Sequence, residues 1–226
     1  GIPAVVAIRG LRRAIDAAAS GTSEPVLVAL DGEAGAVTIG PSGAQIADLE
    51  IRHGQRLREG ETARELRGRP GRTADGVAIP LLANIGRPED VTRALEAGAE
   101  GVGLFRTEFL FVGRSDAPSE DEQVTAYAAV LRAFGPDRPV VVRLADIGGD
   151  KGIPYLHVAA ESNPFLGVRG LRLAYEDRTL LRTQVRAIAR AGALAGARPH
   201  LMAPMVSTLE DVALLREIVA DALASL

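Results

Sequence analysis

The chain has 226 residues, 47% of them hydrophobic, which is enough to bury a core in one large or two small domains. Its 26 basic and 29 acidic residues give a net charge of -3, which excludes the broad basic surface that nonspecific nucleic-acid binding needs. The absence of cysteine excludes disulfides and thiolate metal sites. No apolar run approaches the roughly 18 residues of a membrane span and no signal peptide is visible, so we expect a cytoplasmic protein that binds neither nucleic acid nor membrane.

The first part of the chain is expected to form short strands and helices. A strand-like run covers residues 4–8, a helical pattern 11–19, and two further strands 26–30 and 36–39, with a turn at Asp31-Gly32 between them. From residue 42 to about residue 67 the pattern is helical and strongly charged, and residues 68–76 are rich in turn formers. We therefore assign residues 1–41 to one domain, 42–75 to a linker helix and loop, and 76–226 to a second domain.

Strand and helix patterns alternate in the second domain. Strands are expected at residues 79–84, 101–105, 139–144 and 200–206, and helices at 88–97, 119–134, 166–175, 178–193 and 208–224. The helix at 119 opens with Ser119-Glu-Asp-Glu122, a capping-box pattern. Four strands that are each followed by a helix predict an α/β fold with a parallel sheet. Four such units are half of a closed eight-stranded barrel.

The two ends of the sequence predict a fragment. Residues 1–8 open on an apolar run without an initiator methionine, and the helix at residues 208–224 is followed by no further strand. We therefore expect the chain to be part of a longer protein.

Three stretches place charge at the ends of expected elements. They are Gly101-Val-Gly-Leu-Phe-Arg-Thr-Glu-Phe-Leu-Phe111, Pro139-Val-Val-Val-Arg-Leu-Ala-Asp-Ile-Gly-Gly-Asp-Lys151 and Asn163-Pro-Phe-Leu-Gly-Val-Arg-Gly-Leu-Arg-Leu173. An apolar strand that runs into Arg106 and Glu108 has no packing reason to place charge there, which indicates a ligand. Arg143 and Arg169 also stand at element ends, beside glycines that let a ligand approach the backbone.

The chemistry of that ligand follows from the arginines. Several guanidinium groups that face one barrel mouth would repel each other unless an anion with more than one negative group bound there. Bidentate arginine also suits carboxylate and phosphate oxygens. These considerations predict a small phosphorylated carboxylic acid. The polar residues expected near the strand ends are Asn84, Arg106, Glu108, Arg143 and Asp146.

A purely structural interpretation competes with the ligand hypothesis. In it, each arginine pairs with Glu108, Asp146 or Asp150 as a salt bridge at the barrel rim. The joint position of Arg106 and Arg143, each just beyond an apolar strand, favours the ligand over this alternative.

Three segments resemble the phosphoenolpyruvate-protein phosphotransferases, the Enzyme I family of bacterial sugar phosphotransferase systems and members of the phosphoenolpyruvate (PEP)-utilising enzymes. The segments are Gly103-Leu-Phe-Arg-Thr-Glu-Phe-Leu-Phe111, Asp146-Ile-Gly-Gly-Asp-Lys151 and Asn163-Pro-Phe-Leu-Gly-Val-Arg169. Residues 1–6 and 200–206 extend the resemblance over nearly the whole chain. It implies part of a swivelling phosphohistidine-type β/α domain, a connecting helix, and the first half of a TIM-type (β/α)8 barrel.

The resemblance implies transfer of a phosphoryl group from PEP to an enzyme histidine and then to the carrier protein HPr, the first step of sugar uptake. Arg106 and Arg143 match the family's PEP-binding arginines, and Arg169 matches a third basic residue of that site. They would hold the phosphoryl oxygens and neutralise charge during transfer. The supporting residues would be Glu108, Asn84, Asp146 and Lys151. A homodimer is implied for the full-length protein.

The family's catalytic parts are expected outside this chain. Its phosphohistidine motif would precede Gly1, and its Mg2+ ligands and proton-donating cysteine would follow Leu226. The resemblance therefore implies Mg2+ as cofactor, no catalytic or metal-binding residue within these 226 residues, and an inactive isolated chain.

Two alternatives stay open. One is an enzyme like pyruvate phosphate dikinase or PEP synthase, although the phenylalanine-rich residues 105–111 favour the sugar-transport enzyme. The other is a noncatalytic module that binds an anion or a partner protein.

Overall fold

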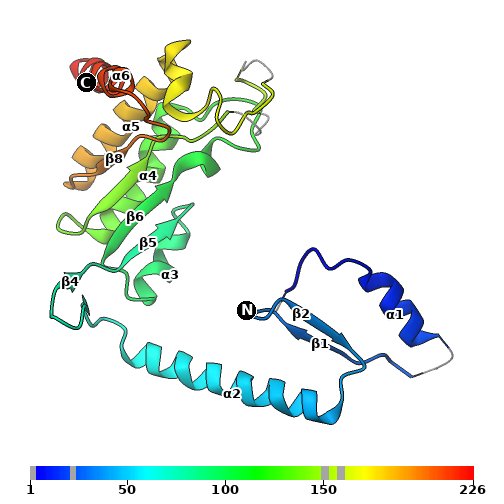
Figure 1. Ribbon diagram of the computed structural model, residues 1–226. Helices are drawn as coiled ribbons and strands as arrows, with labels where there is room; N and C mark the ends of the chain where they lie inside the picture. Colours follow the sequence, from blue (N-terminus) through cyan, green and yellow to red (C-terminus); the bar gives the residue numbers. More distant parts are fainter. Residues whose placement is uncertain (1–3, 21–23, 149–152, 157–160) are drawn as a thin grey trace. The chain divides into compact units, whose positions relative to one another are not determined.

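The computed structural model describes residues 4–20, 24–148, 153–156 and 161–226, and the chain divides into two compact units (Figure 1). The units are Gly1–Leu66 and Arg67–Leu226. The domain limits expected at residues 41 and 75 stay predictions.

The first unit is a two-stranded hairpin with two helices. Its elements are α1 (Leu11–Ala19), β1 (Val28–Asp31), β2 (Ala36–Ile39) and α2 (Gly43–Glu65). The hairpin is antiparallel, with Val28 opposite Ile39 and Asp31 opposite Ala36. The predicted helices at 11–19 and from 42 to about 67, and the predicted strand at 36–39, are thereby confirmed.

The strand predicted at residues 4–8 is wrong. The backbone there is irregular, Ala7 has a φ of 60°, and among the described residues the hairpin strands pair only with each other. A left-handed alanine interrupts an extended run, and a strand needs a neighbour to receive its hydrogen bonds.

Asp31 fastens the hairpin turn to α2 and is the one buried residue that the structure describes in this unit. Its carboxylate accepts hydrogen bonds from the backbone N–H groups of Glu33 and Ala34, both at 3.1 Å, and pairs with Arg52. The Ala34 amide is the largest influence that lowers the pKa of Asp31, and Arg52 lowers it further. No apolar side chain described in this unit is fully buried.

The second unit is built on a four-stranded parallel sheet in the order β5-β6-β7-β8, which confirms the predicted parallel α/β pattern. Its strands are β5 (Leu82–Ile85), β6 (Gly101–Arg106), β7 (Val140–Arg143) and β8 (His200–Met202), preceded by a small hairpin of β3 (Gly71–Arg72) and β4 (Ala78–Ile79). Its helices are α3 (Asp90–Glu96), η1 (Thr107–Leu110), α4 (Glu120–Phe134), η2 (Gly170–Tyr175), α5 (Thr179–Ala195) and α6 (Leu209–Ala224). The predicted capping box at Ser119 and Glu122 is confirmed.

Three expected elements differ from the structure. The strand expected at 200–206 ends at Met202, before a turn in which Met205 has a φ of 68°. The strand expected at 79–84 is split at Pro80, which has no N–H to donate, so that β4 pairs with β3 and β5 pairs with β6. The helix expected at 166–175 is a short 3-10 helix from Gly170, because Arg169 is extended and forms a β-bridge with Gly148.

The core lies between one face of the sheet and the helices. Val102, Phe105 and Val142 are fully buried against helix residues such as Tyr127, whose ring meets that of Phe105 edge-on at a centroid distance of 5.9 Å. Side chains alternate along a strand, so Arg143 projects from the opposite face to Val142. Figure 1 shows α4 and α5 running along the sheet. No helix that the structure describes is both long and apolar enough to cross a membrane.

Candidate functional site

The carboxyl ends of β6 and β7 bring the two predicted strand-end arginines together. Arg106 and Arg143 are register partners on these adjacent parallel strands. Immediately after β6, the Thr107 hydroxyl donates a 2.7 Å hydrogen bond to the carbonyl of Arg143. The two strand ends are therefore tied to each other at the point where the charged residues begin.

Two arginines and two carboxylates form a partly buried cluster beside this tie. Arg143 pairs with Glu108 at 2.9 Å and with Asp146 at 3.4 Å, and Arg169 pairs with Asp146 at 2.9 Å. Glu108 also accepts a 2.7 Å hydrogen bond from the backbone N–H of Asp146. Side-chain exposures range from 6% for Glu108 to 20% for Arg143, so water screens these pairs only in part.

The cluster balances its own charge. We expected the guanidinium groups to repel each other unless an anion bound, but Glu108 and Asp146 neutralise Arg143 and Arg169 within the chain. The pairing foreseen in the structural interpretation is therefore present for these two arginines. The Nε atom of Arg143 is nevertheless buried without a hydrogen-bond partner among the described residues, so one donor stays unsatisfied.

Gly148 lets the chain that carries Arg169 approach β7. It forms an antiparallel bridge with Arg169 and has a φ of 104°. A Cβ atom at this position would lie 2.8 Å from the carbonyl oxygen of Val168. Glycine is required here on both counts, and the bridge places the Arg169 guanidinium on Asp146.

Arg106 differs from the other two arginines because it has no acidic partner within the described part of the chain. Its side chain is exposed, and its guanidinium carbon lies 5.8 Å from the ring centroid of Phe109. Asn84 is exposed on β5, and no hydrogen bond joins its side chain to any residue that the structure describes. Lys151 and Asp150 lie outside the described residues.

A buried glutamine that our sequence analysis missed supports the site. The Gln184 side chain on α5 accepts a 2.9 Å hydrogen bond from the N–H of Ala145 and donates to the Thr107 hydroxyl at 2.9 Å and to the Tyr127 hydroxyl at 3.0 Å. It thus holds the residue before Glu108 and the residue before Asp146. A signal was available, because Gln184 falls on the apolar stripe of its helix between Leu181 and Ile188.

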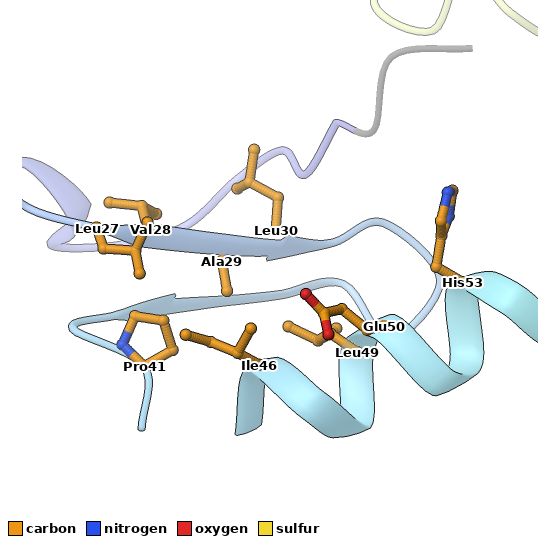
Figure 2. A pocket seen from close by; sticks show the side chains of 9 residues that line it. All are labelled: Leu27, Val28, Ala29, Leu30, Pro41, Ile46, Leu49, Glu50 and His53. Atoms are coloured by element: carbon orange, nitrogen blue, oxygen red, sulfur yellow. The ribbon is translucent and has the colours of Figure 1, made fainter. Parts of the chain in front are cut away.

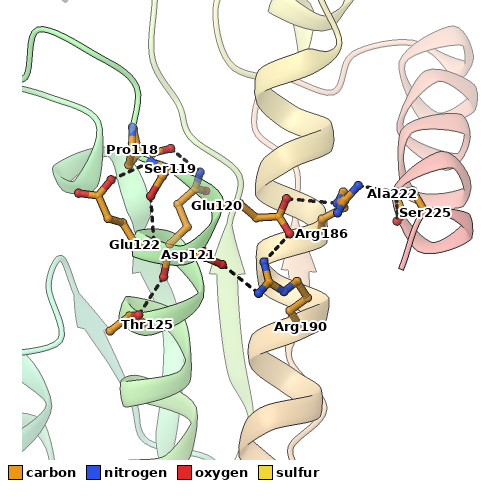
Figure 3. Close-up of polar contacts among 11 residues, drawn as sticks. Pro118, Ser119, Glu120, Asp121, Glu122, Thr125, Arg186, Arg190, Ala222 and Ser225 are labelled. Carbon is orange, nitrogen blue, oxygen red and sulfur yellow. Dashed lines mark hydrogen bonds and ion pairs between the residues drawn. The ribbon is translucent and has the colours of Figure 1, made fainter.

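Other polar and apolar features lie apart from this cluster. The first unit has a cavity of about 340 Å3 lined by apolar side chains of β1 and α2, and Figure 2 shows Ala29 of β1 on the side of the strand that faces Ile46 of α2. Figure 3 shows Glu120 at the start of α4 bound by Arg186 and Arg190 of α5. These ion pairs join two helices, so we assign them a structural role.

A metal ion has no suitable set of ligands among the described residues. No group of three or more His, Cys, Asp and Glu side chains is gathered there. The carboxylates of Glu108 and Asp146 are occupied by arginines. Mg2+ prefers several free oxygen ligands, which these residues do not offer.

Comparison with known proteins points to one family. Residues 60–226 match the model of a protein family described as "PEP-utilising enzyme, PEP-binding domain". The phosphoenolpyruvate-protein phosphotransferase of Streptomyces coelicolor is 46% identical over 212 residues, which are 93% of this chain and 36% of the relative. That of Bacillus subtilis is 43% identical over 211 residues, 93% of this chain and 35% of the relative.

A longer relative extends the match. The multiphosphoryl transfer protein of Rhodobacter capsulatus is 42% identical over 220 residues, 97% of this chain and 25% of the relative. The chain therefore spans about a third or less of the length of these relatives.

Proposed function

Because this chain belongs to the PEP-utilising enzymes, through a PEP-binding domain of TIM-barrel type, we propose that it binds PEP at the carboxyl ends of β6 and β7. The longer protein would be a phosphoenolpyruvate-protein phosphotransferase, which moves the phosphoryl group of PEP to its own histidine and on to HPr. In this proposal residues 1–41 belong to the swivelling phosphohistidine domain, 42–75 link the domains, and 76–226 are the first half of the barrel. The names and identities of the relatives support it.

The observation that carries the proposal is the pair Arg106 and Arg143 at adjoining strand ends, with Arg169 joined to Arg143 through Asp146. A guanidinium has five N–H donors, and one carboxylate uses at most part of them. Glu108 and Asp146 therefore hold Arg143 and Arg169 in place while donors stay available to a phosphate or carboxylate group. Such fixed donors need little reorganisation when the ligand binds.

The chemical role of these residues would be to orient PEP and to balance its charge. PEP carries a phosphate and a carboxylate, and the transferring phosphoryl group spreads negative charge over its oxygens in a loose transition state. In this proposal Arg143 would contact the phosphoryl oxygens through guanidinium N–H groups that Glu108 and Asp146 leave free, and Arg106 and Arg169 would contact the rest of the anion. Asn84 and Lys151 stay predicted supporting residues.

In this proposal the remaining parts of the reaction would be supplied by residues beyond those that the structure describes. Glu108 and Asp146 are paired with arginines and are not free to hold Mg2+, and Mg2+ ligands beyond Leu226 stay a prediction. Transfer to HPr, homodimerisation and a cytoplasmic location stay predictions too.

The binding test uses this chain. Calorimetric titration in buffer containing MgCl2 should show that PEP binds to this chain. Pyruvate, which lacks the phosphate, should bind at least about tenfold more weakly than PEP. Arg143→Lys should lower PEP affinity about tenfold or more because lysine cannot bind bidentately, while the melting temperature changes by only a few degrees. Arg138→Lys, an exposed residue before the amino end of β7, is the matched control. Equal affinity for PEP in both variants would contradict the site.

The transfer test uses the full-length protein that contains this chain. We would incubate it with labelled PEP and HPr, without ATP, and follow the label. Label on HPr is expected. A requirement for ATP or AMP would instead indicate a dikinase-like enzyme, and the absence of any covalent label would indicate a noncatalytic binding module.

A further inference from the structure

The positive charge that is free to attract an anion lies at the end of β5 as well as β6. Arg143 and Arg169 are paired with two carboxylates, so that cluster is neutral as a whole. Two other arginines at the strand ends, Arg87 and Arg106, make no ion pair with any residue that the structure describes. A long-range attraction for an anion must therefore come mainly from this second pair.

One aromatic ring brings Arg87 and Arg106 together. The guanidinium carbon of each lies 5.8 Å from the ring centroid of Phe109, so the two charges are no farther apart than twice that distance. The ring can lie there because residue 86 is glycine, where a Cβ atom would stand 2.7 Å from the ring carbons. Two like charges that share one platform repel each other, and a bound anion would relieve that repulsion.

Strand register places Arg87 at the same edge of the sheet as the proposed PEP site. Ile85 is the register partner of Phe105, so Arg87 follows β5 close to where Arg106 ends β6. Asp90, which interacts electrostatically with Arg87, accepts hydrogen bonds from the backbone N–H groups of Gly86 and Arg87 at 2.9 and 3.0 Å. It forms no ion pair with the Arg87 guanidinium, which is left exposed.

We propose that Arg87 is a fourth arginine of the anion site, which draws a phosphorylated carboxylic acid toward Arg106 and strengthens its binding through charge. This inference rests on the proposed function, because PEP is the anion that the site would receive. Arg87 supplies affinity and not chemistry. The anion's more negative group would gain most from it.

The test measures PEP affinity at two salt concentrations. Each variant of this chain is titrated with PEP at about 0.02 M and about 0.3 M salt, concentrations at which screening is weak and strong. At low salt, Arg87→Gln should weaken PEP binding about three- to tenfold, the size expected for one charge at a solvated distance of several ångströms from a multivalent anion. At high salt the difference should shrink to about twofold or less. Arg87→Lys, which keeps the charge, should retain most of the affinity.

The matched control is Arg93→Gln on α3. It removes the same charge, and Arg93 also interacts electrostatically with Asp90, but it makes no contact with the Phe109 ring. It should bind PEP as the unchanged chain does. Equal losses in Arg87→Gln and Arg93→Gln, or no loss in Arg87→Gln, would overturn the role of Arg87.

The outcomes also separate this inference from the proposed function. If the unchanged chain binds PEP and Arg143→Lys weakens that binding while Arg87→Gln does not, only the role of Arg87 fails. If the unchanged chain binds no PEP, the proposed site fails and the inference falls with it. Circular dichroism should show that each variant is folded, because Arg87 is exposed.

Discussion

Replacing the buried Gln184 by leucine tests whether its hydrogen bonds stabilise the strand ends that carry the candidate site. Leucine is similar in size but cannot accept the 2.9 Å hydrogen bond from the N–H of Ala145, which would then be buried and unpaired. An unsatisfied buried donor costs about 1–3 kcal/mol. Thr107 and Tyr127 would each lose one donor but keep their other partners, Arg143 and Gln123. The loss of these two hydrogen bonds adds about 1 kcal/mol to the cost of the unpaired Ala145 amide, so the free energy of unfolding should fall by about 2–4 kcal/mol.

The assay is urea unfolding followed by far-ultraviolet circular dichroism, because the chain has no tryptophan to serve as a fluorescence probe. The matched control is Arg182→Leu, an exposed position on the same helix, which should change the free energy of unfolding by less than about 0.5 kcal/mol. Faster hydrogen exchange at the Ala145 amide would locate the effect. If Gln184→Leu is as stable as the control, the glutamine does not couple β6 to β7 and our reasoning is refuted.

Two further predictions concern the backbone and the pH response of the second unit. Gly148→Ala should lower the free energy of unfolding by about 1–3 kcal/mol and weaken PEP binding, because φ is 104° and the new methyl group would meet the Val168 carbonyl beside Arg169. Urea unfolding measures the first effect and titration with PEP the second. Unchanged stability and affinity would contradict the prediction. Asp211 accepts hydrogen bonds from the Ser207 amide and the Tyr175 hydroxyl, and these lower its pKa below 3.8. Its stabilising effect is thus complete above that value and lost as pH falls through the folded-state pKa. Asp211→Asn should flatten the fall in the free energy of unfolding as pH drops below about 4, and an equally steep fall would argue against this origin.

Local signals predicted much of the fold. The helix at 11–19 and the strand at 36–39 were predicted with the bounds the structure has, and the capping residues Ser119 and Glu122 marked the start of α4. Such signals depend on residues within a few positions of each other. The strand predicted at 4–8 failed because a strand also depends on a neighbour that its own residues do not specify.

The candidate site was predictable in its residue types but not in its pairing. Arg106 and Arg143 follow apolar strands, so their placement at adjoining strand ends could be foreseen. Which carboxylate neutralises which arginine depends on side chains from separate loops. Gln184 and Thr107 meet across 77 positions of sequence, which no local pattern encodes. Arg87 could have been found, because it follows β5 as Arg106 ends β6.

The outer strands of the sheet have a consequence for handling the molecule. β5 and β8 have four and three residues, and each pairs with one strand among those that the structure describes. The unpaired amide and carbonyl groups of such an edge strand can form hydrogen bonds with an extended peptide, including a segment of another copy of this chain that is not yet folded. Their brevity limits how firmly a stray segment can attach. Low protein concentration and moderate temperature should therefore keep this chain from aggregating through its edge strands.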